Sequence, residues 1–123
     1  MPDEVRLAMP ANPEFLRLAR VTAMGLASRV SFTIDDIEDL RIAIDELLLT
    51  VIGTNGRPGS VLLTYRLTDD GLEVVGRGQF DEATPSVRLT EFAELILGAV
   101  ADEYEVGLDD GVPTFRLVKR RAG

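Results

Sequence analysis

Glu46 and Thr50 are two polar residues four positions apart in a segment with a helical apolar period, so they are expected to lie on one face of a helix. A carboxylate at Glu46 could accept a proton from a water molecule or from a substrate hydroxyl group. Thr50 offers a hydroxyl group on a short, stiff, β-branched side chain. In the alternative interpretation, Glu46 is an ordinary helix residue. Its neighbour Asp45 can form a routine ion pair with Arg41, which lies one turn earlier.

Two other segments contain residues that a phosphate or nucleotide site could use. Gly76-Arg77-Gly78 follows a predicted strand and is interpreted as a glycine-rich turn, although a lone Gly-x-Gly is a weak signal for phosphate binding. Lys119-Arg120-Arg121 is the one basic cluster, and it is interpreted as a solvated end rather than a contact patch.

The helices that must position these residues show clear start signals. Asn12 and Pro13 predict a helix over 13–28 with Phe15, Leu18, Ala19 and Thr22 toward the sheet. Thr33 and Asp36 predict a capping box at the start of a helix over 34–52. A third helix is expected over 90–101, with its buried side formed by Phe92, Leu95, Ile96, Ala99 and Val100.

Alternating apolar residues and turn signals predict the strands, at 5–9, 61–67, 72–76, 104–108 and 112–118. The resulting order is β-α-α-β-β-α-β-β. We therefore predict an α/β (α+β) two-layer sandwich in which a mixed, mostly antiparallel sheet of four or five strands is covered on one face by three helices. The 123 residues are expected to form a single domain, 1–123.

Composition excludes several functional classes. Thirteen basic and twenty-one acidic residues give a net charge of −8, which argues against nucleic acid as a partner. The chain has no histidine and no cysteine, so the commonest general base and thiolate metal sites are absent, and no metal site is expected. No apolar run is long enough to span a membrane, and the start Pro2-Asp3-Glu4 is unlike a signal segment. A cytoplasmic location is therefore expected.

The first two predicted helices, and above all the segments 19–22 and 39–46, resemble the anti-sigma-factor serine/threonine kinases of the histidine-kinase-like (GHKL) ATPase superfamily. The resemblance covers about 5–118 and implies a Bergerat-type fold. It also implies that Glu46 stands at the catalytic base and that Thr50 stands where the family has a magnesium-binding asparagine. An arginine on the family's first helix contacts the sigma factor and the anti-anti-sigma factor, and Arg20 matches that position.

The nucleotide motifs of that family are largely altered in this chain. Gly78 matches a family glycine, but Gly76 stands where an aspartate would bind adenine. Glu91 and Glu94 stand at a glycine-rich motif that binds phosphates, where one like-charge contact at about 4 Å costs on the order of 4 kcal/mol. The segment matching the ATP lid has shrunk to 81–90.

Two functions are compatible with these residues. The preferred one is an anti-sigma-factor-like regulator that binds a sigma factor or an anti-anti-sigma factor without using ATP or another cofactor. The alternative is a divergent Ser/Thr kinase that binds magnesium-ATP through Glu46, Thr50 and the turn at 76–78. A third possibility is that the chain is the non-catalytic subunit of an intact kinase paralogue.

Two surfaces are predicted to meet partners. Arg17 and Arg20 are three positions apart, so they are expected to point outward on one flank of the first helix. The family commonly forms homodimers, and the alternating Val5, Leu7 and Met9 could pair at an exposed strand edge. Equally, these three residues could complete the domain's own core.

Overall fold

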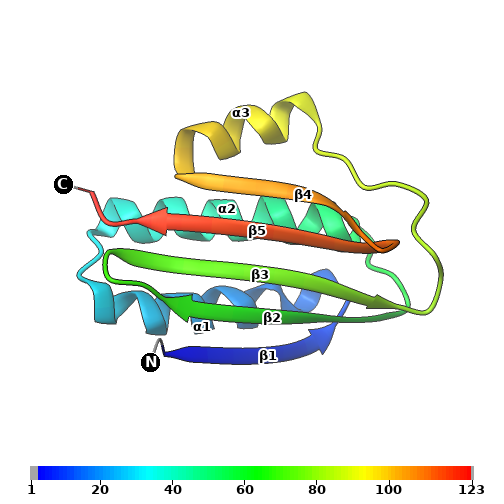
Figure 1. Cartoon of the computed structure of the whole chain (residues 1–123), viewed down its shortest axis with the longest axis horizontal. Helices are drawn as coiled ribbons and strands as arrows, with labels where there is room; N and C mark the ends of the chain where they lie inside the picture. The colour runs from blue at the N-terminus through cyan, green and yellow to red at the C-terminus, as the bar shows by residue number, and fades with distance from the viewer. Residues whose placement is uncertain (1–2, 123) are drawn as a thin grey trace.

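Five strands form one sheet, and three α-helices accompany it (Figure 1). The computed structural model describes residues 3–122. The strands are β1 Glu4–Pro10, β2 Gly59–Leu67, β3 Gly71–Phe80, β4 Glu103–Asp109 and β5 Val112–Arg120. They lie in the order β1-β2-β3-β5-β4, and all four pairings are antiparallel. The helices are α1 Leu16–Ala27, α2 Ile34–Ile52 and α3 Glu91–Val100, with 3-10 turns at Pro13–Phe15 and Ser28–Val30. The predicted two-layer sandwich is confirmed, with a sheet that is antiparallel throughout and not mixed.

The long helix α2 begins with the predicted capping box. The Thr33 hydroxyl accepts a hydrogen bond from Asp36 N, and the Asp36 carboxylate accepts one from Thr33 N. Asp36 is buried and also accepts from Ala122 N at 3.3 Å, while Lys119 lies 4.0 Å away. The start of α2 is thus tied to the end of β5, so that the helix is fixed across the sheet.

The core lies between the sheet and the helices α1 and α2. Its largest fully buried members include Tyr65, Phe115, Leu40 and Leu63. The Tyr65 hydroxyl donates a hydrogen bond of 2.9 Å to the carbonyl of Ala19, so the one polar group of this buried side chain is satisfied by the backbone of α1. No helix among residues 3–122 is long and apolar enough to cross a membrane.

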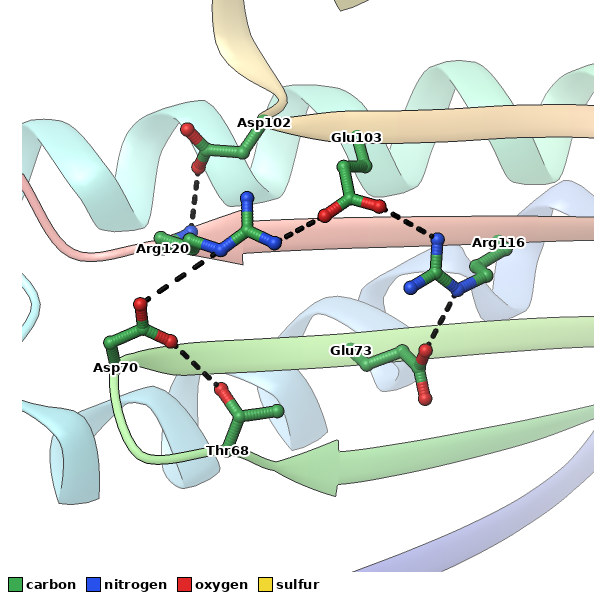
Figure 2. A network of polar contacts seen from close by, with 7 residues as sticks. All are labelled: Thr68, Asp70, Glu73, Asp102, Glu103, Arg116 and Arg120. Carbon is green, nitrogen blue, oxygen red and sulfur yellow. Dashed lines mark hydrogen bonds and ion pairs between the residues drawn. The ribbon is translucent and has the colours of Figure 1, made fainter.

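The face of the sheet opposite the helices carries a network of ion pairs (Figure 2). The Arg116 guanidinium donates to Glu73 at 2.8 Å and to Glu103 at 3.1 Å, so it links three neighbouring strands. Arg120 pairs with Glu103 and with Asp70. The hydrogen bond from Arg120 is the largest of the causes that lower the pKa of Glu103. The face of the sheet opposite the helices is therefore a charged surface.

The predicted buried faces of two helices are only partly right: Ala19 is buried, and Phe15 and Val100 pack against the core, but other predicted members are exposed. On α1 the buried residues are Leu16, Ala19, Ala23 and Ala27, whereas Leu18 is 44% exposed. On α3 they are Ala93 and Leu97, whereas Phe92 and Leu95 are 70% and 74% exposed and Ala99 is exposed as well. Alanine supplies three of the four buried residues of α1 and one of the two of α3, and this small side chain lets a helix approach its neighbours closely.

Candidate functional site

Glu46 and Thr50 lie one turn apart on α2, and both are half-buried. The Thr50 hydroxyl donates a hydrogen bond of 2.8 Å to the carbonyl of Glu46. Its proton is therefore used within the helix, and its lone pairs remain for another donor or for a metal ion. Among the hydrogen bonds of residues 3–122, Thr50 bonds the backbone of Glu46 and not its carboxylate.

Thr50 also lines a pocket of about 390 Å³ at the end of α2. Two loops complete the pocket: residues 53–57 follow α2, and residues 84–88 lie in the segment that matches the ATP lid. Arg57 and Arg88 bring positive charge to it, and the hydroxyl of Thr84 is buried without a hydrogen-bond partner in the described part of the chain. Glu46, Gly76 and Gly78 do not line this pocket. The predicted nucleotide residues are therefore not gathered around one cavity.

Gly76 lies inside a strand and not in a turn as predicted, because β3 continues to Phe80. Phe115 on β5 is its partner in the antiparallel register. A Cβ atom at position 76 would overlap the ring of Phe115, and that ring is itself only 2% exposed. A strand glycine often marks such a close approach. The space that an aspartate would need here is already filled by an aromatic side chain.

Gly78 has the same relationship with a second aromatic residue. A Cβ atom at this position would overlap the ring of Phe80, two residues further along β3. The Arg57 guanidinium lies 3.9 Å from the centre of that ring, a cation–π contact, and it donates a hydrogen bond of 3.1 Å to the carbonyl of Glu82. The beginning of the loop that matches the ATP lid is thereby fastened to the sheet.

The N-terminus of α3 is capped by the side chain of Thr90. The Thr90 hydroxyl accepts a hydrogen bond of 3.0 Å from Ala93 N, so one of the free amides of this helix end is satisfied. Glu91 and Glu94 occupy the first turn and are exposed. Carboxylates in the first turn interact favourably with the positive end of a helix, and their negative charge opposes a bound phosphate there.

Arg17 and Arg20 differ in their surroundings. Arg17 is exposed as predicted, whereas Arg20 is half-buried, with its Nε 3.1 Å from Oδ1 of Asp45 on α2. These two atoms are buried and do not have the geometry of a hydrogen bond. Burial is the main cause of a raised pKa at Asp45, and the charges of Arg20 and Arg41 oppose that rise. The prediction that both arginines point freely outward is therefore wrong for Arg20.

The residues around the altered motifs do not fit a nucleotide held as the family resemblance implies. The position of the adenine-binding aspartate is covered by Phe115, and the start of α3 carries two carboxylates. Sequence reasoning missed Phe115 and Phe80. Phe80 lies two residues after Gly78 on the same strand, so its sequence signal was local. The signal for Phe115 requires the register between β3 and β5.

Comparisons with known proteins agree with this fold. The chain is 32% identical to the serine-protein kinase RsbW of Bacillus velezensis and 34% identical to RsbW of Bacillus subtilis, in each case over 89% of this chain and 81% of that protein. A crystal structure of the RsbU and RsbW domains of Rv1364c from Mycobacterium tuberculosis matches with a TM-score of 0.71 at 15% identity. That match covers 96% of this chain and 32% of the other chain. No protein-family model matches.

The fold is that of the RsbW domain in this solved structure. The chain belongs to the RsbW family of serine-protein kinases, because it is more than 30% identical to such relatives over most of their length. The family resemblance predicted from the two helical segments is confirmed.

Proposed function

We propose that this protein is an anti-sigma-factor-like regulator in a partner-switching circuit that controls transcription. It acts by binding a sigma factor, an anti-anti-sigma factor or both, with little or no turnover of ATP. The family relationship supports the proposed role in a partner-switching circuit. The proposal of little or no ATP turnover rests on the ring of Phe115, which fills the space beside Gly76.

The surface of α1 is the proposed contact for these partners. Leu18, Val21 and Met24 are 44%, 54% and 37% exposed, and they follow one another at intervals of three residues. Arg17 is exposed beside them and, with Phe15, Leu18 and Val21, lines a shallow pocket of about 400 Å³. An apolar stripe flanked by an arginine is typical of a protein interface. Arg20 can bind a partner at this surface only after it exchanges its ion pair with Asp45 for a contact with that partner.

We also propose that the chain forms a homodimer through β1. This strand is one edge of the sheet, and Val5 is 37% exposed on it, whereas Met9 is buried in the core. An edge strand of seven residues offers unpaired backbone groups to a second copy. Light scattering at high protein concentration tests this proposal, and a mass near 13.4 kDa would overturn it.

One observation favours the alternative, a divergent serine/threonine kinase. The pocket beside Thr50 contains Arg57 and Arg88, and guanidinium groups bind phosphate well. A nucleotide held there would lie in a place other than the one implied by Gly76, in a pocket that Thr50 of α2 lines.

Co-purification from the native host, followed by a binding and phosphorylation assay, separates the two functions. We expect the same affinity for the partner with and without about 1 mM magnesium-ATP, and no transfer of labelled phosphate. Arg17→Glu is expected to weaken the complex by about 1–2 kcal/mol. Arg77→Ala, on the opposite face of the sheet, is the matched control and should bind as the parent does. Phosphorylation of a partner serine would overturn the proposal.

A further inference from the structure

The net charge of this protein is concentrated in one quarter of the chain. Residues 81–110 contain nine acidic residues and one arginine, which together give −8. The other residues contain twelve acidic and twelve basic side chains, so they are neutral as a group. Residues 81–110 comprise α3, β4 and the loops that flank them, and Figure 1 shows both elements along one edge of the molecule.

Part of this acidic charge is neutralised, but the part on α3 is not. Glu103 pairs with arginines of β5, and Asp109 pairs with Arg77 at 2.8 Å. Glu91 and Glu94 are exposed and form no ion pair with any other residue between 3 and 122. The helix itself contains no basic residue. The acidic charge of α3 is therefore available to a binding partner.

The same helix exposes an apolar stripe. Phe92 and Leu95 are 70% and 74% exposed, and Ala99 continues the stripe at helical spacing. Gly98 is also exposed and has open space where a side chain would be, so another backbone can come close. By helical geometry Glu91 and Glu94 lie along one border of the stripe. Two large side chains exposed to this degree on one helix mark an interaction surface.

We propose that this stripe of α3, formed by Phe92, Leu95 and Ala99 and bordered by Glu91 and Glu94, docks a basic amphipathic helix of a protein partner. Apolar anchors on the partner would cover Phe92 and Leu95, since helices recognise one another through residues at such spacing. Lysine or arginine on the flank of the partner helix would pair with the two glutamates and steer the encounter.

The negative charge of α3 also argues against two other binding partners, a second copy of the chain and an anionic membrane. A second copy placed on α3 would bring its own acidic residues against Glu91 and Glu94, and like charges oppose such a dimer. An anionic membrane surface is repelled for the same reason. The inference goes beyond the proposed function, because α3 is a different element from the α1 surface and the test below does not depend on a sigma factor.

A synthetic helical peptide tests the inference directly. The probe is a fluorescent amphipathic peptide of about 18 residues with a leucine stripe flanked by arginines, and its matched control has glutamate in place of every arginine. Fluorescence anisotropy gives the affinity for the whole chain. We expect the basic peptide to bind more tightly than the acidic peptide, and we expect its binding to weaken as salt is added. Equal affinity for the two peptides would overturn the proposal.

Three double variants locate the binding site. Phe92→Ser with Leu95→Ser is expected to weaken binding about tenfold or more, because the apolar anchors are removed. Glu91→Gln with Glu94→Gln should reduce the salt dependence. Ile34→Ser with Leu108→Ser, a control pair of exposed apolar residues outside both proposed binding surfaces, should bind as the parent does. All six positions are exposed, so the fold is expected to persist, and circular dichroism checks it. The proposal fails if the variant with Phe92→Ser and Leu95→Ser binds the peptide as the parent does. It also fails if the parent chain self-associates and this variant does not, because α3 would then be a contact between two copies.

Discussion

Arg20 Nε on α1 lies 3.1 Å from Asp45 Oδ1 on α2, and this ion pair joins the two helices that cover the sheet. Asp45 has a second cationic neighbour, Arg41, at 4.0 Å. The pair is half-buried and lacks hydrogen-bond geometry. Arg20 thus has a structural partner within the chain, in addition to the contact role that its position in the family implies.

A double-mutant cycle measures this ion pair. Arg20→Ala, Asp45→Ala and the double variant should reveal a favourable coupling of about 0.5–1 kcal/mol, the upper range for exposed pairs, because this one is partly shielded from water. Arg20→Ala should also raise the pKa of Asp45 further, since one of the two charges that lower it is gone. Urea unfolding and NMR titration provide the two measurements. Arg17→Ala is the matched control, with a change within about ±0.5 kcal/mol. A coupling of zero would show that the contact is not formed in solution.

Restoring a side chain at Gly76 is expected to destabilise the protein. Gly76→Ala forces the buried ring of Phe115 to move, and overpacking of this kind costs about 1–3 kcal/mol. Phe115→Leu in the same chain should recover part of that loss. Gly98→Ala is the control, because its Cβ would meet open space within a helix, and alanine there should be neutral or stabilise by up to about 1 kcal/mol. Thermal unfolding distinguishes these outcomes, and a stable Gly76→Ala variant would contradict the packing described for Phe115.

Asp36 should make stability depend on pH. Burial is the largest influence and favours the protonated form, but hydrogen bonds from Thr33 and Ala122 together with the charge of Lys119 outweigh it, so the pKa is lowered. A lowered pKa stabilises the fold above the unfolded value near 3.8, and this stability is lost as pH falls through the folded value. Asp36→Asn should therefore cost about 1–2 kcal/mol near pH 7 and progressively less below about pH 4.

Asp35→Asn is the control for this comparison, because Asp35 is exposed in the same helical turn and lacks these bonds. Urea unfolding followed by circular dichroism at several pH values gives the free energies. A cost for Asp36→Asn that does not change with pH would contradict the assigned charge state.

Local signals in the sequence were sufficient for the elements of the fold. The capping box of Thr33 and Asp36, the cap at Asn12 and the Asp-Gly turns all depend on residues a few positions apart, and the structure contains each helix and strand that they bound. The helix faces were harder to predict. Ala23, Ala27 and Ala93 are buried because a small side chain permits close packing, a property that a scale of apolar size does not detect.

The candidate site was only partly predictable for a different reason. The loss of the aspartate at Gly76 could be seen in the sequence, but the covering ring belongs to Phe115, far along the chain. Its position depends on the register of β3 with β5, which long-range packing decides. The contact of Arg20 with Asp45 likewise depends on how α1 crosses α2.

A titration of the whole chain with magnesium-ATP tests the central claim most directly. Isothermal titration calorimetry should detect no binding tighter than the millimolar range, and about 1 mM ATP should then stabilise the fold by at most about 0.4 kcal/mol. The matching change in melting temperature is about 2 °C or less for a domain of this size. Saturable binding in the micromolar range, or a melting shift of several degrees, would contradict the account.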